Sequence, residues 1–474
     1  MSVYWNDLSI LNDIDIEFKD VKDVCESNDS IMLSTNYIEE FMESIMYFID
    51  DYLNENIQIY KEYNFHKILF DNIYNMIEQT YGDILSNMEV DLNDMVQQSI
   101  ERYLYTNNNH RSYLENVIMR QPNVGKIKKR LKYIEKTKEQ PDQRTKEWYL
   151  FRYNGLTASS IWKAVDTVAA RNNIIYEKCK PLKFDSGKED YVNINTPFHN
   201  GHKYEPLSIL IYEKIHKTTI GEFGCIVHDK IPFLKASPDG INIDPKNKLY
   251  GRMLEIKNPI TRKISGIPKK DYWIQMQIQM EVWGLDECDF LETSFKEYEN
   301  EEEFLNDTNG VDDVYIKSSK NERKGVILMF NDGKKPLYEY APVDITSKEF
   351  DCWCEATMTK YEGITWIKNI YWRLETYSCV LVPRNKKWFE YAAPLLQNTW
   401  DTIIKERVEG YEHRKPKKKT KKKKLSPKSI EKLNTKVTKL FPDNAEIKNS
   451  STPIIKIRTE SFDKNKNNIK LEKT

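Results

Sequence analysis

The chain has 474 residues, a length typical of two or three domains. Hydrophobic residues make up 39% and aromatic residues 12%, enough for a sizeable core. No apolar run approaches the length of a membrane span. The first residues lack the basic start of a secretory signal, and seven scattered cysteines are typical of a reduced compartment. We therefore expect an intracellular protein that is not secreted and has no membrane partner.

The formal net charge of -1 conceals a strong asymmetry along the chain. The first hundred residues hold roughly 21 acidic and 4 basic side chains, whereas residues from Tyr411 onward hold roughly 20 basic and 7 acidic ones. We predict an acidic, all-helical accessory domain at 1–138, a folded domain at 139–410, and a basic low-complexity tail at 411–474. Such a tail should be disordered and attract polyanions.

Helical periodicity dominates the accessory domain and recurs later in the chain. A basic helix is expected at 126–138, and another helix should end near Asn154. Pro206 fits the first turn of a further helix, which would place Glu205 near its start. The stretch 171–197 has no clear period and is interpreted as a loop or insertion.

Strands are expected in the middle of the chain, at 220–227, 233–237, 241–243 and 253–257. Tyr272, Gln275 and Gln279 form one helical stripe, and Gly284 supplies a stop for that helix. The remaining elements predicted are an acidic exposed excursion at 298–322, a hairpin of 325–330 with 337–340 around the turn 331–333, and helices at 348–361 and 388–407.

Two short runs, ASPDG and LEIKNP, carry the most specific chemistry. Asp239 in the first and Glu255 in the second are equally far from Asn247, which lies in a strong turn signal. If the chain folds as a hairpin about Asn247, the two carboxylates become cross-strand neighbours. Lys257 lies two residues after Glu255 on the same strand and therefore points to the same face.

Two neighbouring carboxylates repel each other unless a cation lies between them. Oxygen ligands in an open site suit Mg²⁺ or Mn²⁺, and a lysine beside the metal could hold or orient a water molecule. This pattern points to hydrolysis of phosphodiesters. The alternative is a surface hairpin with an ordinary ion pair. The apolar neighbours Leu254, Ile256 and Ala236 place the charges at the edge of a core, where unpaired charge is costly.

Three further motifs accompany the hairpin in a fixed order. They are Trp148-x-x-x-Arg152 with Leu156-Thr157-Ala158-Ser159, then Gly201-x-x-x-Glu205, then Tyr272-x-x-Gln275-x-Gln277. With the hairpin, these motifs span about 141–297 and resemble the lambda-exonuclease or YqaJ-type viral recombinase family of the PD-(D/E)XK nuclease superfamily.

The resemblance implies an α/β fold. We expect a PD-(D/E)XK, restriction-endonuclease-like core, in which helices flank a central mixed sheet, with the helical domain before it and the basic tail after it. It also implies a metal-dependent deoxyribonuclease, specifically an exonuclease that digests linear double-stranded DNA from its ends in viral recombination or DNA processing. If the source is viral, the location would be the host cytoplasm or a viral factory, with the nucleus left open.

The resemblance also assigns the metal ligands. Asp239 and Glu255 would bind Mg²⁺ or Mn²⁺, with the carbonyl of Ile256 as a further ligand. Glu205 would reach a metal directly or through water, and one or two ions would fit this scheme.

The same resemblance gives the catalytic roles. Lys257 would position and activate the nucleophilic water, and Gln275 and Tyr272 would orient Lys257 or that water.

A second set of residues is expected to recognise the strand end. Arg152 has a planar fork suited to phosphate, and the hydroxyls of Thr157 and Ser159 could complete an anion pocket. By resemblance this is a 5′-phosphate pocket, to which Ser237 contributes. The alternative is a structural arginine beside two helix caps. The partners implied are DNA ends, further copies of the chain, and a single-strand annealing protein or helicase.

Other functions are kept as alternatives. One is a structure-selective or single-strand endonuclease similar to CRISPR-associated RecB-like nucleases. The cysteines Cys352, Cys354 and Cys379 lack a nearby fourth thiolate, so we expect no iron–sulfur cluster. The other is a DNA-binding scaffold with an inactive site, although a scaffold has no need of a costly charge cluster.

Overall fold

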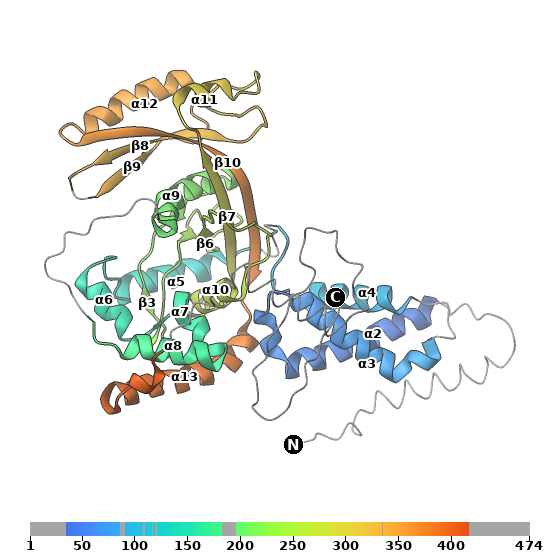
Figure 1. Ribbon diagram of the computed structural model, residues 1–474. Coiled ribbons are helices and arrows are strands. Elements are labelled where there is room, and N and C mark those ends of the chain that lie inside the picture. The colour runs from blue at the N-terminus through green and yellow to red at the C-terminus, as the bar shows by residue number, and fades with distance from the viewer. Residues whose placement is uncertain are drawn as a thin grey trace, which may run out of the picture. The chain divides into compact units, whose positions relative to one another are not determined.

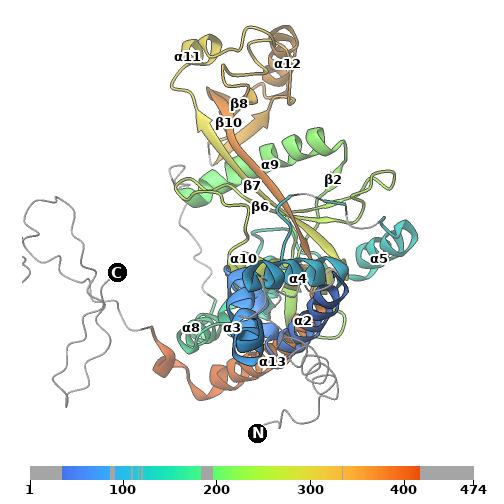
Figure 2. The same cartoon turned by 90° about the vertical axis from the view of Figure 1, so that its right-hand side faces the viewer.

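The computed structural model describes the chain in several segments. These are residues 35–85, 91–107, 110–115, 117–118, 121–182, 196–333 and 335–416. Figures 1 and 2 show a mixed sheet flanked by helices and preceded by a helical region, which confirms the predicted α/β fold. From residue 417 onward the predicted tail lies outside the described residues. No helix within the described segments has the length and apolar character needed to cross a bilayer.

The N-terminal region is helical, as its periodicity predicted. It contains α2 (Thr35–Glu55), the short 3₁₀ helix η2 (Ile57–Lys61), α3 (Phe65–Leu85) and α4 (Leu92–Asn107). The apolar stripe of α2 is buried, with Ile45 and Ile49 fully inaccessible to solvent. The predicted basic helix follows as α5 (Val124–Thr137).

The central sheet has seven strands. Their order is β2 (Ile220–Gly221), β5 (Gly240–Asn242), β6 (Met253–Lys257), β7 (Glu287–Glu297), β10 (Thr365–Pro383), β8 (Lys324–Asn331) and β9 (Pro336–Tyr340). β6 and β7 are parallel, and the other neighbouring pairs in this sheet are antiparallel. The predicted helix α10 (Lys270–Trp283) makes the crossover between the two parallel strands.

A second, three-stranded sheet consists of β1 (Leu156–Thr157), β4 (Leu234–Ala236) and β3 (Ile226–Val227). The strand predicted at 220–227 is therefore wrong in extent, because β2 and β3 lie in different sheets. Gly221 ends β2, and Gly224 lies between the two strands, where its backbone N–H donates to the side chain of Gln140 instead of to a strand.

The long strands β7 and β10 were not predicted. Beyond the core, β10 pairs with β8, and β8 pairs with β9 to form the predicted hairpin (Figure 1, top). One face of this extension packs against α9 (Pro197–His216), through residues such as Leu207 and Ile211. The other face packs against α11 (Glu301–Asn306) and α12 (Ser347–Lys360).

Two predictions about the segment before the hairpin were wrong. The acidic stretch 298–322 is not simply exposed, because α11 inserts Phe304 fully into the core of the extension. The stretch 171–197 is not entirely irregular, because α8 (Val168–Cys179) buries Ile174 and Ile175. Its apolar residues are too few and too closely spaced to show a period by themselves.

The start of α9 also differs from the prediction. The side chain of Thr196 caps the helix, and Pro197, rather than Pro206, occupies its first turn. Pro206 lies inside the helix, and Glu205 is therefore in the middle of α9. The sequence offered two prolines, and the one beside the capping threonine begins the helix.

Arg111 connects the helical region to the α/β core. Its guanidinium is 1% exposed and donates to the carbonyls of Tyr60 at 2.8 Å, Lys61 at 3.3 Å and Pro268 at 2.8 Å. Its own carbonyl accepts from the indole of Trp273 at 2.9 Å. One buried side chain therefore satisfies backbone groups on both sides of the junction.

We predict that Arg111→Ala destabilises the chain by about 3 kcal/mol or more, since it leaves several buried carbonyls without a donor. Urea denaturation followed by tryptophan fluorescence measures this change. Arg102→Ala, at an exposed position of α4, is the control and should leave the transition unchanged. Equal midpoints for the two variants would contradict the structural role of Arg111.

Candidate functional site

The ASPDG and LEIKNP runs form the predicted hairpin. Gly240 pairs with Leu254, and the backbone N–H of Asp239 donates to the Leu254 carbonyl at 3.1 Å. This register places Asp239 opposite Glu255. Gly240 allows β2 to approach closely, because a Cβ there would lie 2.3 Å from the Ile220 side chain.

The carboxylate of Glu255 is fully buried and surrounded by donors. Gln275 donates to its Oε1 at 2.7 Å and Gln279 to its Oε2 at 2.7 Å, while the ammonium of Lys257 also contacts Oε1. Gln279 further donates to the carbonyl of Ser237 at 2.9 Å. The prediction that Gln275 faces this patch is confirmed, and the functional roles remain a proposal.

Gln279 was not identified as a site residue. Its spacing of four residues from Gln275 on one helical stripe was the available signal, because such residues lie on the same helix face. Tyr272, which begins that stripe, places its ring centroid 5.3 Å from the ammonium of Lys257.

The patch carries more negative charge than its ammonium neutralises. Burial raises the pKa of Asp239 well above its usual range, and the carboxylates of Glu255 and Glu205 raise it further. Burial and Glu255 likewise raise the pKa of Glu205. Burial alone would lower the pKa of Lys257, but Glu255 and Asp239 reverse the effect and raise it, so the ammonium is charged at neutral pH.

The fit of a divalent cation depends on these carboxylates. Within the described segments, no group of three or more His, Cys, Asp or Glu side chains is spaced as a ready metal-ligand set. Both oxygens of Glu255 already accept hydrogen bonds, and Asp239 accepts from the backbone N–H of Ile256 at 2.7 Å. The donor chemistry nevertheless fits a hard cation, since burial and the neighbouring carboxylates raise the pKa values of Asp239 and Glu205, and a cation bound there would favour their ionised forms.

One cavity joins the two predicted groups of residues. Its volume is about 710 Å³. Asp239, Glu205 and Gln275 line one part of it, and the predicted anion-binding residues line another part: Arg152, Thr157, Ser159 and Ser237. Residues that are far apart in the chain therefore face the same space. Glu255, Lys257 and Tyr272 are not among the lining residues, and Glu255 is linked to the cavity through the hydrogen bond that it accepts from Gln275.

Arg152 projects from the last turn of α6 (Lys146–Tyr153). Its guanidinium lies 3.5 Å from the hydroxyl of Thr157, 3.4 Å from that of Ser159 and 4.5 Å from the ring centroid of Trp148. Within the described residues it forms no salt bridge with a carboxylate. Thr157 precedes the short helix α7 (Ala158–Ile161) but makes no side-chain cap. Within the described residues, Arg152 therefore has no carboxylate partner and Thr157 does not cap a helix. Both observations argue against the alternative of a structural ion pair beside helix caps.

Two lysine side chains contact the backbone of α6 next to Arg152. The ammonium of Lys178 donates to the Arg152 carbonyl at 2.6 Å, and that of Lys235 donates to the Phe151 carbonyl. Burial, followed by the charges of Arg152, Arg407 and Lys235, lowers the pKa of Lys178 to about 7. The sequence analysis missed Lys178 because it lies in α8, which was interpreted as a loop.

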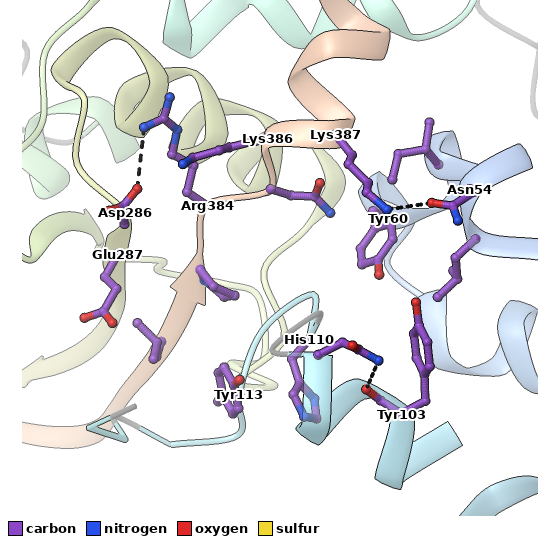
Figure 3. A pocket seen from close by; sticks show the side chains of 16 residues that line it. Asn54, Tyr60, Tyr103, His110, Tyr113, Asp286, Glu287, Arg384, Lys386 and Lys387 are labelled. Atoms are coloured by element: carbon purple, nitrogen blue, oxygen red, sulfur yellow. Dashed lines mark hydrogen bonds and ion pairs between the residues drawn. The ribbon is translucent and has the colours of Figure 1, made fainter. Parts of the chain in front are cut away.

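A second cavity of about 380 Å³ lies where the helical region meets the core (Figure 3). Charged groups that line it have partners within the cavity: Arg384 pairs with Asp286 at 3.5 Å, and Lys387 donates to the side-chain carbonyl of Asn54 at 2.7 Å. None of the residues predicted to act in catalysis or phosphate binding lines it. The first cavity is therefore the candidate site.

The raised pKa of Asp239 predicts a stability that falls as the pH rises in the absence of metal. Above about pH 4 the unfolded chain loses the Asp239 proton first, so the free energy of unfolding falls until the folded chain loses it as well. Asp239→Asn should reduce this decline, of which Glu205 contributes a further part, and should melt higher than wild type at pH 8 in EDTA. Asp351→Asn, at an exposed position, is the control. Parallel melting curves for wild type and Asp239→Asn between pH 4.5 and 8 would refute the interpretation.

The chain is similar to several known proteins. A curated relative, the uncharacterized protein R354 of Acanthamoeba polyphaga mimivirus, is 32% identical in an alignment of 297 residues that covers 56% of this chain. The chain spans about half of that relative's length, 52%. An alkaline exonuclease of Laribacter hongkongensis, LHK-Exo, and its complex with dAMP each align over 62% of this chain and all of their own, at 18% identity and a TM-score of 0.31.

A family model covers the site itself. It matches residues 147–286, which include Arg152 and the whole acidic hairpin. The match extends through α10 and thus contains all four motifs identified in the sequence. This segment matches the YqaJ-like viral recombinase domain, which confirms the family resemblance inferred from the motifs.

Proposed function

We propose that this chain is a metal-dependent deoxyribonuclease that digests linear double-stranded DNA from its ends. One observation carries the proposal: a single cavity is lined by an acid–amide cluster that is hydrogen-bonded to the Glu255–Lys257 pair, and by an arginine that lies among hydroxyls and forms no ion pair within the described residues. The first group suits phosphodiester hydrolysis, and the second suits a terminal phosphate.

The carboxylates would hold the metal. Asp239, Glu255 and Glu205 are the ligands, with the Ile256 carbonyl as a further one, and Mg²⁺ or Mn²⁺ would supply Lewis acidity and a more acidic water. Binding must compete with the donors on Glu255. We therefore expect the bound cation to share that carboxylate with Gln275 and Gln279 rather than to displace both.

The remaining residues would act on the attacking water and on the negative charge of the transition state. Because Lys257 is protonated while it contacts Glu255, it would first hold the attacking water as a donor and stabilise negative charge in the transition state. Gln275 keeps Glu255 in place, and the ring of Tyr272 limits where the ammonium can lie.

An exonuclease must distinguish a strand end from an interior phosphate, and the extra charge of a terminal phosphate provides that difference. Arg152, Thr157, Ser159 and Ser237 would bind it. Burial lowers the pKa values of the neighbouring Lys178 and Lys235, and a phosphate bound there would favour their charged forms. The names of similar proteins support this reading, since LHK-Exo is described as an alkaline exonuclease and the family model as a viral recombinase domain.

Assembly, partners and location extend the same proposal. A role in viral recombination would place the chain inside an infected cell, and the mimivirus relative supports a viral setting. Oligomers of the chain and an annealing protein or helicase would complete the process.

We predict that Lys257→Ala lowers the rate of DNA cleavage by ~10²–10⁴-fold, because a group that acts in the transition state is lost. DNA affinity should change little, since many other basic groups remain. Initial rates on linear duplex with Mg²⁺, and binding in EDTA, measure the two effects. Near-normal turnover would remove Lys257 from the mechanism.

The same assay decides between the candidate activities. Wild type should degrade linear duplex and leave covalently closed circles intact. Nicked circles would favour the structure-selective or single-strand endonuclease, and the absence of any cleavage would favour the DNA-binding scaffold.

Arg152→Ala should reduce the preference for a 5′-phosphate. Wild type should digest 5′-phosphorylated duplex faster than 5′-hydroxyl duplex, and the variant should narrow that difference by about tenfold, as expected for a lost charged hydrogen bond of ~1.5–3 kcal/mol. The measurement is the initial rate on both substrates, with thermal melts as a check on folding. A folded variant that keeps the full preference would disprove the phosphate pocket.

A further inference from the structure

A row of side chains crosses the sheet extension on the face that packs against α9. Strand pairing aligns Lys368 of β10, Met329 of β8 and Tyr338 of β9. Met329 and Tyr338 pack with residues of α9, which identifies the face. The hydroxyl of Tyr338 lies 2.7 Å from Nε2 of His199 at the start of α9. The row and the first turn of α9 therefore form one surface.

This surface continues into the candidate site. His202, one turn after His199, lies 3.1 Å from the guanidinium of Arg144 and lines the cavity together with Glu205. Because arginine only donates, Nε2 of His202 accepts this hydrogen bond. Arg144 has φ of 69°, a left-handed conformation that is uncommon outside glycine. We call Arg144, His199, His202, Lys335, Tyr338 and Lys368 the α9–β9 surface.

The α9–β9 surface carries positive charge that is largely unneutralised. Within the described residues Arg144, Lys335 and Lys368 form no salt bridge. Burial lowers the pKa of His202, and Arg144, His199 and Lys335 lower it further. Burial, Lys203 and Arg144 lower the pKa of His199 in the same way. Among the described carboxylates, Glu297 lies near Lys368 but is paired with Lys203, and Glu205 lies near Arg144.

The opposite face of the extension has the opposite charge. α11 begins with three consecutive glutamates and carries no basic residue. A polyanion would be repelled from that side and attracted to the α9–β9 surface, which also leads to the cavity.

We propose that the α9–β9 surface binds the phosphate backbone of the DNA duplex on its way to the cavity. This inference rests on the proposed function and adds a binding surface to it. The contacts would be independent of base sequence, since they come from cations on a strand row and a helix turn. The extension built on β8 and β9 would thus act as an arm that holds substrate beside the reaction.

The test is charge reversal on the arm of the full chain. Lys335→Glu with Lys368→Glu should weaken binding of a ~40-base-pair duplex about tenfold or more in EDTA. It should also reduce the salt slope of log K by ~1.8, from two phosphate contacts at ~0.9 each. In cleavage assays with Mg²⁺, KM should rise while kcat stays within about twofold of wild type, because these lysines contact no reacting atom.

A matched control makes the same change in charge elsewhere. Lys320→Glu with Lys348→Glu places the reversal at exposed lysines in the segment after α11 and at the start of α12, and should alter neither affinity nor salt slope. If wild type cleaves DNA but both double variants bind it equally well, the surface inference fails and the proposed function stands. A fall in kcat with unchanged KM would also overturn the inference. If wild type neither binds nor cleaves DNA, both proposals fail.

Discussion

The hydrogen bonds to the buried carboxylate of Glu255 are the constraint on which the site depends. They join β6, which carries the carboxylate, to α10, which supplies both glutamines. The amide of Gln279 also donates to the carbonyl of Ser237, just before Asp239. A buried charge without such partners would cost several kcal/mol. The same bonds that make Glu255 tolerable therefore fix where Asp239 and Lys257 lie.

A second polar network sets the position of α9. Tyr212 donates to Asp289 at 2.6 Å, and Asp289 also accepts from the fully buried Arg252 at 3.1 Å. The hydroxyl of Ser208 lies 2.8 Å from that of Thr293. These contacts hold α9 against β6 and β7, so Glu205 is placed by polar bonds as well as by apolar packing. These hydrogen bonds fix the position of α9 relative to the central sheet.

The sequence predicted the parts of the fold that local chemistry determines. The symmetry of Asp239 and Glu255 about Asn247 predicted the hairpin register, and Gly284 marked the end of α10 with a left-handed cap. β10 was missed because its pattern changes along its length: its start is exposed, while Val380 and its neighbours are buried. No single period describes such a strand, and its partners β7 and β8 are distant in sequence.

Only part of the candidate site could be predicted from local sequence. Arg152 and the acidic hairpin were found from motifs, whereas Lys178 and Gln279 needed the fold to bring them close. The start of α9 was misplaced because Pro206 and Pro197 offered two plausible first turns, and only the cap at Thr196 decides between them. Interactions between distant segments, rather than local propensity, determine these positions.

α10 is anchored at both ends by arginines from preceding segments. Near its start, Trp273 donates to the carbonyl of Arg111, and at its end Arg130 of α5 donates to the carbonyls of Val282 at 2.9 Å and Trp283 at 2.7 Å. Arg130 also pairs with Asp229, so this arginine of the basic helix is committed to the core. A helix clamped in this way cannot swing its amides during a reaction. The electrostatic environment of Glu255 is therefore set in the absence of substrate, and in the proposed reaction little reorganisation free energy would remain to be supplied at the transition state.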